Sequence, residues 1–407
     1  MQSSRHRMNR RTFLKVGTLG AASAMTPAIP AQEAAPEPVC RVFGRTGLKV
    51  NVVGFGSLKT SEPAVFQAAF DRGVNWVDTA RVYMDGRNER LVGEALKGYR
   101  DKVYVSTKVV PGPIEEMEAS VAESLDALGL ESVDLMQLHH LNSRDEVFNK
   151  DYRAFFARLR KEGKTKFVGV TSHSNEIEVL DAVVSDPEKF WDTMMIPYNF
   201  KSPPATKAAI ERAAKAGVGI IAMKTQAGGY ETRELGDISP HQAALKYVLR
   251  DPNVSFAIPG MTDLKQVEEC VAVMRMTLTR ADLELLERYG RAIAPYYCHR
   301  CGVCRGGCPA GIQIPEINRS LMYAEGYRHG AGAFDLPRDS GVRVGVGLRK
   351  VLGMHGAVSK RSRHRRAHAK GSNTVCVTPL WRLKIRLLQK QQEIQGQHAQ
   401  QIEFQMI

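Results

Sequence analysis

The sequence is poor in cysteine, and the little it has is unevenly placed. Only seven of its 407 residues are cysteines. Cys40, Cys270 and Cys376 are scattered, which excludes the disulfide framework of a small secreted scaffold. The other four stand together in "CHRCGVCRGGC" (298–308). A metal cluster is therefore the better interpretation of the cysteine content.

The middle of the chain carries almost no net charge. Residues 1–31 carry +5 and residues 328–407 carry +11, which leaves −2 on the remainder of a chain whose total is +14. The basic segment "SKRSRHRRAHAK" (359–370) contains no interleaved aromatic side chains. Proteins that bind single-stranded nucleic acid usually combine positive charge with aromatic side chains on which the bases stack. We therefore expect no nucleic-acid partner.

The N-terminus lacks an apolar run long enough to span a membrane, because the stretch up to about residue 29 is short and broken by glycine and proline. It begins with "NRRTFLKVG", in which Arg10 and Arg11 precede Phe-Leu-Lys. This pattern is typical of a twin-arginine (Tat) export signal. We predict that residues 1–31 are such a signal and that the Tat export machinery is a partner. The expected location is the periplasm or cell envelope, with the cytoplasm as the alternative.

From residue 41 onward, short apolar runs alternate with longer amphipathic ones. Eight strands are predicted, at 50–56, 74–80, 103–109, 133–139, 166–172, 193–199, 218–224 and 255–260. Segments between them, such as "TKAAIERAAKAG", have helical periodicity and close on a glycine such as Gly217. Residues 32–295 are therefore predicted to form an α/β fold, a (β/α)8 TIM barrel. A doubly wound sheet is the alternative, although only "GFG" stands where a G-x-G-x-x-G motif is expected.

Polar residues follow three successive predicted strands, at the end of the barrel where catalytic groups gather. "DTARVY" supplies Asp78 and Tyr83, "STK" supplies Lys108, and "LHH" supplies His139 and His140. Each has an ordinary structural explanation when taken alone, such as a solvated lysine. Titratable groups on three successive strand ends, however, indicate an active site.

These motifs resemble the catalytic tetrad of the aldo-keto reductases, and the similarity runs from about residue 41 to 290. The resemblance implies that Tyr83 is the acid, that Lys108 and Asp78 tune it, and that His139 orients the carbonyl of a small carbonyl or sugar-like substrate. A nicotinamide would give the hydride. The chemistry agrees, because a free phenol has a pKa of about 10 and a nearby ammonium that favours phenolate makes it a better acid.

The resemblance also separates the two adjacent histidines and nominates residues for the nucleotide. The family motif places its histidine directly after the last aliphatic residue of the strand, so His140 is expected to be only a neighbour. The implied nucleotide-binding residues are Thr171 and Ser172 in "GVTSHS", Tyr198 and Asn199 in "IPYN", and Gly260, Lys265 and Glu269 in "IPGMTDLKQVEEC". NADP is the family default and NAD the alternative, because Gly260 and Gln266 occupy the positions of the basic residues that typically clasp a 2′-phosphate.

The cysteine run has the spacing C-x2-C-x2-C-x3-C-P of bacterial ferredoxins, whose thiolates hold a [4Fe–4S] cluster. The predicted ligands are Cys298, Cys301, Cys304 and Cys308. Zinc, the alternative, fits this spacing poorly. Residues 296–327 are therefore predicted to form a small ferredoxin-like iron–sulfur segment, as in a subset of aldo-keto reductases, which would pass electrons to an external carrier. A second functional hypothesis is an exported redox sensor or electron-transfer protein that uses the barrel as a nucleotide-binding scaffold.

The tail at 328–407 lacks helical or strand periodicity, and a disordered basic extension is the commoner explanation for such composition. A shifted reading frame is a sharper one. If the true frame begins one nucleotide later, a cysteine codon arises wherever a codon ending in TG precedes one that starts with C or T. Codon choice permits such junctions after Leu348, Val351, Met354 and Val358, and at Met354-His355 the cysteine is forced.

The spacing of these junctions repeats that of the first cysteine run. We therefore predict that a frameshift between about Tyr327 and Val344 has destroyed a second ferredoxin run. In two-cluster ferredoxins the fourth cysteine of each run ligates the other cluster. The chain as written would then hold at most one cluster, with Cys308 itself as the available fourth ligand, and the frame-restored chain two.

Overall fold

The structure is a computed structural model that describes residues 39–229, 239–294, 297–298, 318–319 and 322. The chain divides into two compact units. The first comprises residues 1–301 and 321–329 and contains every helix and strand reported below. The second comprises residues 302–320 and 330–407, and of it the structure describes only Asn318 and Arg319. The predicted signal segment and basic tail lie outside the described residues.

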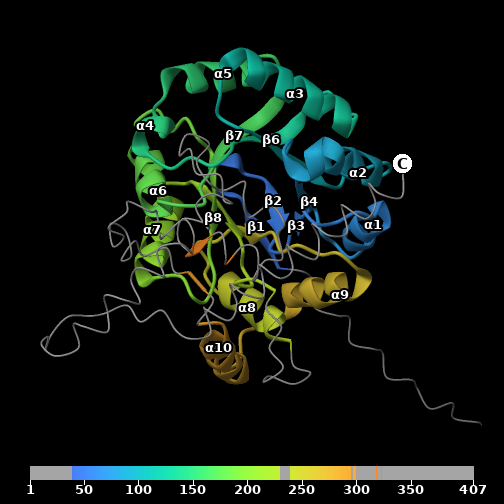
Figure 1. The fold of residues 1–407 in the computed structure, drawn as a ribbon, viewed down its shortest axis with the longest axis vertical. Helices are drawn as coiled ribbons and strands as arrows, with labels where there is room; N and C mark the ends of the chain where they lie inside the picture. The colour runs from blue at the N-terminus through green and yellow to red at the C-terminus, as the bar shows by residue number, and fades with distance from the viewer. Residues whose placement is uncertain (1–38, 230–238, 295–296, 299–317, 320–321, 323–407) are drawn as a thin grey trace, which may run out of the picture. The chain divides into compact units, whose positions relative to one another are not determined.

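Eight parallel strands form one sheet, and helices surround it (Figure 1). In chain order the strands are β3 (Phe55–Gly56), β4 (Trp76–Asp78), β5 (Tyr104–Val109), β6 (Val133–Leu138), β7 (Thr165–Thr171), β8 (Thr193–Pro197), β9 (Gly219–Met223) and β10 (Phe256–Ala257). Each pairs with the next along the chain. Parallel bridges from Val53 to Ala257 and from Gly56 to Gly260 join the first strand to the last. The sheet therefore closes, and the predicted eight-stranded (β/α)8 barrel is confirmed.

The first predicted strand, 50–56, is wrong in its extent. Residues 49–51 form β2 (Lys49–Asn51), which pairs antiparallel with β1 (Cys40–Val42) in a hairpin outside the barrel sheet. Only Phe55 and Gly56 enter the barrel as β3. The continuous apolar run "VNVVGFG" therefore concealed a change of sheet, which periodicity alone does not reveal.

The helices occupy the segments between the strands. They are α1 (Pro63–Asp71), α2 (Arg87–Ala95), α3 (Ile114–Leu128), α4 (Arg144–Val147), α5 (Lys150–Lys161), α6 (Glu176–Ser185), α7 (Pro204–Lys215), α8 (Pro240–Leu249), α9 (Leu264–Ala272) and α10 (Arg280–Ile293). Gly217 follows the last turn of α7 with a left-handed φ of 82°, as its sequence position predicts. Within the described residues, no helix combines the length and apolar character needed to cross a membrane.

Two apolar layers stabilise the barrel. One lies between the strands and the helices, and the other fills the interior. Inside, Phe43 packs edge-on against Trp76 and Phe256, with ring centroids 5.2 and 5.0 Å apart. A Cβ atom at Gly219 would lie 2.5 Å from the Phe43 ring, so this close approach requires glycine. The aromatic cluster blocks the N-terminal ends of the strands, which leaves the C-terminal ends for polar chemistry.

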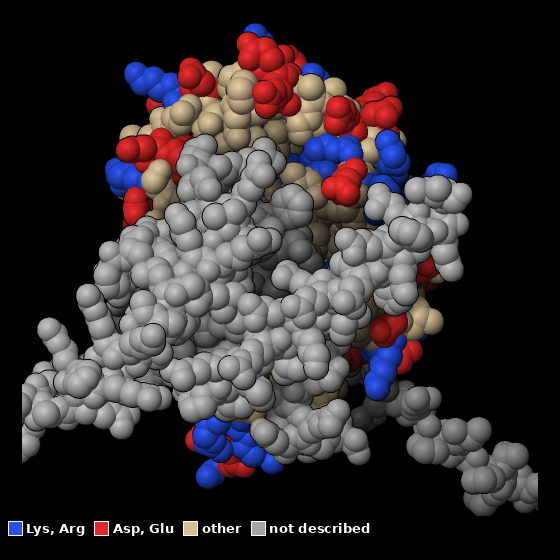
Figure 2. Space-filling model, in the orientation of Figure 1, with Lys and Arg blue, Asp and Glu red and all other residues tan. Residues whose placement is uncertain are grey.

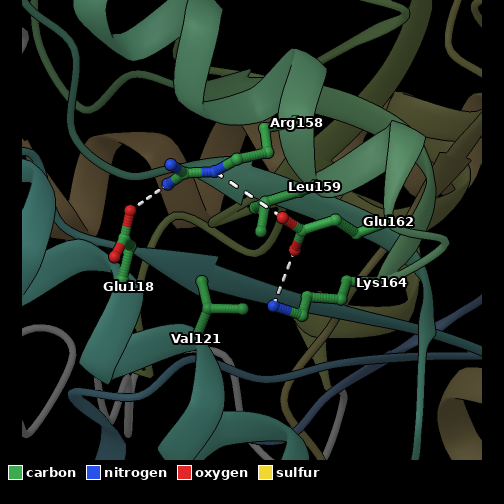
Figure 3. Close-up of a pocket in the computed structure, with 6 residues that line it drawn as sticks. All are labelled: Glu118, Val121, Arg158, Leu159, Glu162 and Lys164. Carbon is green, nitrogen blue, oxygen red and sulfur yellow. Dashed lines mark hydrogen bonds and ion pairs between the residues drawn. The ribbon is translucent and has the colours of Figure 1, made fainter.

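The outer helical surface is polar and carries charges of both signs. Figure 2 shows acidic and basic side chains interspersed over the part of the surface formed by α3 and α5. Between these helices lies a shallow hollow lined by Glu118, Val121, Arg158, Leu159, Glu162 and Lys164 (Figure 3). Its charged side chains pair with one another, since Arg158 contacts both Glu118 and Glu162. The hollow contains none of the strand-end residues.

Candidate active site

The structure brings the four predicted catalytic residues together at the C-terminal ends of β4, β5 and β6. Asp78 is the last residue of β4, Lys108 lies near the end of β5, and His139 follows β6 directly. Tyr83 begins the 3-10 turn η3 (Tyr83–Gly86) after β4. Because parallel strands end on one face of a barrel, these side chains converge although they are far apart in sequence.

Lys108 is the centre of the cluster. Its side chain is 1% exposed, and its Nζ donates to Asp78 Oδ2 at 2.5 Å, to the Thr79 carbonyl at 2.7 Å and to the Tyr83 hydroxyl at 3.2 Å. Burial alone lowers the pKa of Lys108, but the charge of Asp78 and the contact with Tyr83 raise it above the ordinary value. The lysine is therefore a buried ammonium that touches the tyrosine hydroxyl.

Asp78 is held in place by the neighbouring strands. Its Oδ1 accepts from Ser106 Oγ at 2.7 Å and from Gln137 Nε2 at 3.0 Å. Trp76 Nε1 in turn donates to Ser106 Oγ at 3.1 Å. Both carboxylate oxygens are thus hydrogen-bonded, which is the condition for keeping an ion pair buried without a large penalty. These contacts fix the position of Lys108.

The loop that carries Tyr83 is anchored at its base by a buried asparagine. Asn88 Nδ2 donates to the Ser57 carbonyl at 2.9 Å, and its Oδ1 accepts from Thr79 Oγ1 at 2.7 Å and from Ser57 Oγ at 2.5 Å. Met84 and Asp85, directly after Tyr83, have left-handed φ values of 51° and 53°. Such conformations persist where their surroundings determine them, and Asn88 on α2 contacts this turn, with its Nδ2 3.9 Å from the Met84 sulfur.

A buried ion pair anchors the same loop to β5. Arg81 lies 2.9 Å from Glu89 Oε2, and Thr107 Oγ1 donates to Glu89 Oε1 at 2.6 Å. Burial raises the pKa of Glu89, although the hydrogen bond from Thr107 and the charge of Arg81 act in the opposite direction. Tyr83 is therefore positioned from both α2 and β5.

His139 is a buried, neutral imidazole beside these groups. It is 1% exposed, and its ring centroid lies 6.2 Å from that of Tyr83. Burial first, and then the charges of His140, Lys108 and Lys224, hold the pKa of His139 well below its ordinary value of 6.5. Its Nδ1 has no hydrogen-bond partner among the residues that the structure describes. An imidazole of this kind can orient a substrate group without acting as the acid.

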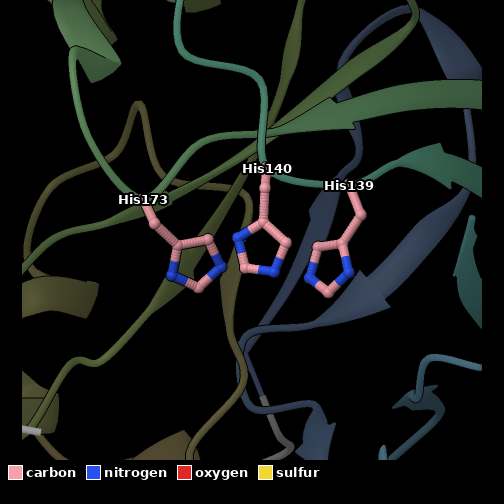
Figure 4. Close-up of side chains that lie close together, drawn as sticks. All are labelled: His139, His140 and His173. Carbon is pink, nitrogen blue, oxygen red and sulfur yellow. The ribbon is translucent and has the colours of Figure 1, made fainter. Parts of the chain in front are cut away.

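Two further histidines continue from His139. The rings of His139 and His140 stack at 3.7 Å, and those of His140 and His173 lie 4.3 Å apart. Figure 4 shows the three rings in a row with His140 in the middle. Lys224, directly after β9, places its Nζ 2.7 Å from His173 Nδ1. His140 is thus part of an extended cluster.

The predicted nucleotide residues Thr171, Ser172, Tyr198 and Asn199 all lie at the ends of β7 and β8 and are buried. Thr171 Oγ1 accepts from the His140 amide at 3.0 Å, and Asn199 Nδ2 donates to the Lys224 carbonyl at 3.0 Å. Tyr198 instead lies in the apolar layer between strands and helices. Its hydroxyl is bound to Asp251 at 3.2 Å, and burial together with that charge raises its pKa far above normal.

The remaining nucleotide candidates lie on the segment after β10. Gly260 bridges to Gly56 at the closure of the barrel, and Lys265 and Glu269 lie on α9. Lys265 is exposed and Glu269 is partly buried. The Asp263 side chain caps α9 by accepting from the Gln266 amide at 2.9 Å. These roles stay predictions.

Only one of the four predicted cluster ligands belongs to the described residues. Cys298 is partly buried, and its amide donates to the Met322 sulfur at 3.3 Å. Cys301, Cys304 and Cys308 lie outside the described residues.

Sequence reasoning passed over Ser106, Gln137 and His173, and it treated His140 only as a neighbour of His139. Ser106 precedes Lys108 by two residues, and Gln137 precedes His139 by two. Since alternate residues of a strand face the same side, both point inward one layer below a catalytic residue. That spacing is a signal from which their supporting role could have been predicted.

Comparisons with known proteins show similarity to oxidoreductases of one family. A model of the aldo/keto reductase family matches residues 57–235 and 231–290. An L-galactose dehydrogenase of Arabidopsis thaliana is 29% identical over 283 residues, which is 58% of this chain and 87% of that protein. A methylglyoxal reductase of Escherichia coli is 27% identical over 57% of this chain and 85% of its own length. An aldo/keto reductase of Klebsiella pneumoniae, solved with NADPH, matches with a TM-score of 0.53 and 24% identity over 62% of this chain and 95% of that one.

Proposed function

The chain belongs to the aldo/keto reductase family of oxidoreductases, and we propose that it reduces the carbonyl group of a small carbonyl or sugar-like substrate with NADPH. The contact between the Lys108 ammonium and the Tyr83 hydroxyl carries this proposal. A buried ammonium 3.2 Å from a phenol is the arrangement that a tyrosine acid requires. The methylglyoxal reductase and the NADPH complex among its relatives support the substrate class and the nucleotide.

Each residue of the cluster has a distinct task. Bound NADPH supplies the hydride that the carbonyl carbon accepts. Tyr83 gives its proton to the carbonyl oxygen, and Lys108 stabilises the negative charge left on the phenolate. Asp78 keeps Lys108 charged and in place. His139, neutral because its pKa is lowered, holds the carbonyl oxygen by a hydrogen bond.

The residues at the ends of β7 and β8 would hold the nicotinamide. Thr171 and Ser172 supply hydroxyls and Asn199 an amide, all buried, and polar groups of this kind can hydrogen-bond a carboxamide. Gly260, Lys265 and Glu269 belong to the segment that would hold the adenosine-phosphate part of the nucleotide. NADP is proposed over NAD on the strength of the relatives solved with NADP and NADPH.

Replacing Tyr83 by phenylalanine tests the function. We expect Tyr83→Phe to lower kcat by about a hundredfold or more, the scale of a lost general acid, while NADPH still binds. Tyr152→Phe on α5 is the matched control and should retain full turnover. Unchanged turnover in Tyr83→Phe would contradict the assignment. Tight NADPH binding without turnover of any carbonyl by the unmodified chain would favour the redox sensor or electron-transfer protein instead.

We also propose that Cys298, Cys301, Cys304 and Cys308 hold a [4Fe–4S] cluster that exchanges electrons with an external carrier. The ferredoxin spacing supports this. Protein purified without oxygen should contain iron and sulfide, and Cys304→Ser should lose both. Absence of iron from the unmodified chain would contradict the proposal. If the frameshift is real, restoring the frame should double the iron content, and nucleotide sequencing of the codons for Leu348, Val351 and Val358 tests it directly, because each must end in TG.

We further propose export by the twin-arginine route to the periplasm or cell envelope. The pair Arg10-Arg11 before Phe-Leu-Lys supports it. Replacing both arginines by lysine should retain the protein in the cytoplasm. Cytoplasmic residence of the unmodified chain in a fractionation would contradict the proposal.

A further inference from the structure

The histidine row and Lys224 form a second polar cluster at the barrel mouth, of which the reduction itself uses only His139. The row starts at His139, beside Tyr83, and ends at the ammonium of Lys224 (Figure 4). The ring centroids of His139 and His173 lie 5.9 Å apart. A cationic and hydrogen-bonding surface therefore begins where the substrate carbonyl would lie and extends away from it.

The backbone presents two of these side chains in an unfavourable conformation. His140 and Lys224 have left-handed φ values of 65° and 55°, which residues other than glycine seldom adopt. Each is held by a neighbour: Asn142 Nδ2 donates to the His140 carbonyl at 2.8 Å, and Asn199 Nδ2 donates to that of Lys224 at 3.0 Å. Strained residues that the surroundings hold in place cluster at ligand-binding sites.

The charge of the cluster distinguishes between its two plausible ligands, a metal cation and an anion. Nitrogens of His139, His140 and His173 lie within 4.8 Å of one another, as in a metal site. However, the Lys224 ammonium can only donate, so at 2.7 Å it occupies the Nδ1 lone pair of His173. A divalent cation would also lie beside this positive charge. An anion, in contrast, is attracted to the ammonium and to imidazole N–H groups.

We propose that His140, His173 and Lys224 form a subsite for an anionic group, a carboxylate or a phosphate, on the carbonyl substrate. This rests on the proposed function, because Tyr83 and His139 must hold the carbonyl at the other end. The span from the carbonyl to the anionic group is about that between the His139 and His173 rings, 5.9 Å. Because an extended chain reaches about 1.3 Å per bond, the anionic group lies about four or five bonds from the carbonyl oxygen. A short oxo acid or a sugar phosphate has these dimensions.

Matched substrate pairs test the proposal with NADPH-loaded full chain. 4-Oxobutanoate is compared with its neutral methyl ester, and glyceraldehyde 3-phosphate with glyceraldehyde, so the two pairs separate carboxylate from phosphate recognition. The readout is the ratio of kcat/KM for the anionic member to that for the neutral one. Lys224→Met should lower this ratio about tenfold in at least one pair, the scale of a lost charge-assisted hydrogen bond. Lys224→Arg should retain most of it.

Lys207→Met on α7 removes one exposed positive charge elsewhere and should leave the ratio unchanged. Lys224→Gln replaces Lys224→Met if thermal unfolding shows that the methionine variant does not fold. An unchanged ratio in both pairs overturns the proposal. So does a loss confined to the NADPH dissociation constant, since the ammonium would then serve the nucleotide.

A binding measurement separates this proposal from the proposed function. If the unmodified chain turns over neither pair, the reductase assignment fails, and calorimetric titration of 4-hydroxybutanoate then decides the subsite alone. Binding that weakens about tenfold in Lys224→Met supports the subsite. Absent or unaltered binding overturns it.

Discussion

The two sides of the barrel mouth differ in how their polar groups are held. On the lysine side, Asp78, Lys108 and Tyr83 are joined by hydrogen bonds, and Ser106 and Gln137 complete the coordination of the aspartate. On the histidine side, three imidazole rings lie against one another in a row, and the His139 Nδ1 has no partner among the described residues.

The difference separates chemistry from recognition. A proton donor must be fixed before the substrate arrives, and a closed network of charged hydrogen bonds achieves this. Groups that recognise the substrate must instead keep hydrogen-bonding capacity for it. The lysine side is therefore expected to govern kcat and stability, and the histidine side to govern substrate choice and the response to acid.

Removing the lysine should produce the largest effect on stability. Lys108→Met leaves the Asp78 carboxylate buried without its counter-ion, which costs about 3 kcal/mol of unfolding free energy. The double variant Lys108→Met with Asp78→Asn should recover most of this loss while remaining inactive. Chemical denaturation of all four proteins in a double-mutant cycle measures the coupling. Additive losses would show that the buried pair is not the source of the stability.

Acid should affect the histidine side and spare the lysine side. The pKa of His139 is lowered from 6.5 in the folded state, so below pH 6.5 the unfolded chain binds a proton that the folded one does not. The contribution of His139 to the free energy of unfolding is therefore present above that pH and is lost as the pH falls below it, by up to about 1.4 kcal/mol per pH unit. The raised pKa of Lys108 has the opposite sign: its contribution is complete below 10.5 and is lost only as the pH rises above that value. His139→Gln should therefore flatten the fall in stability below about pH 6.5.

His241 is the matched comparison, since burial lowers its pKa too but it lies on α8, outside the row. His241→Gln should flatten the acid limb without altering turnover. An acid limb of undiminished slope in His139→Gln would contradict the assignment of a neutral, buried imidazole.

Single supporting hydrogen bonds should give the smallest effects, and they should differ between the two sides. Gln137→Leu removes one donor to Asp78 and Thr171→Val removes the acceptor of the His140 amide, each at about 1 kcal/mol. The first should mainly lower kcat, because it disturbs the tuning of Tyr83. Thr171→Val should mainly raise the KM for the carbonyl substrate. Equal changes of kcat and KM in Gln137→Leu and in Thr171→Val would contradict the distinction between the lysine side and the histidine side.

The sequence predicted the lysine side better than the histidine side for a physical reason. Asp78, Lys108 and His139 stand at the ends of buried strands, so strand periodicity places them on one face. The row of His140, His173 and Lys224 depends on two left-handed backbone positions and on contact between imidazole rings, neither of which periodicity reveals. The hairpin of β1 and β2 escaped prediction similarly, because residues 50–56 are apolar throughout most of their length.

Transfer of deuterium from nicotinamide to product tests the central claim most directly. Full-length protein is incubated with a small aldehyde and NADPH that carries deuterium at both C4 positions of the nicotinamide, and the alcohol is analysed by mass spectrometry. Deuterium should appear on the carbinol carbon in the unmodified chain, and its rate of appearance should fall about a hundredfold in Tyr83→Phe. An alcohol without deuterium, or an equal rate in the two proteins, would contradict the assignment of Tyr83 as the proton donor in a nicotinamide-dependent reduction.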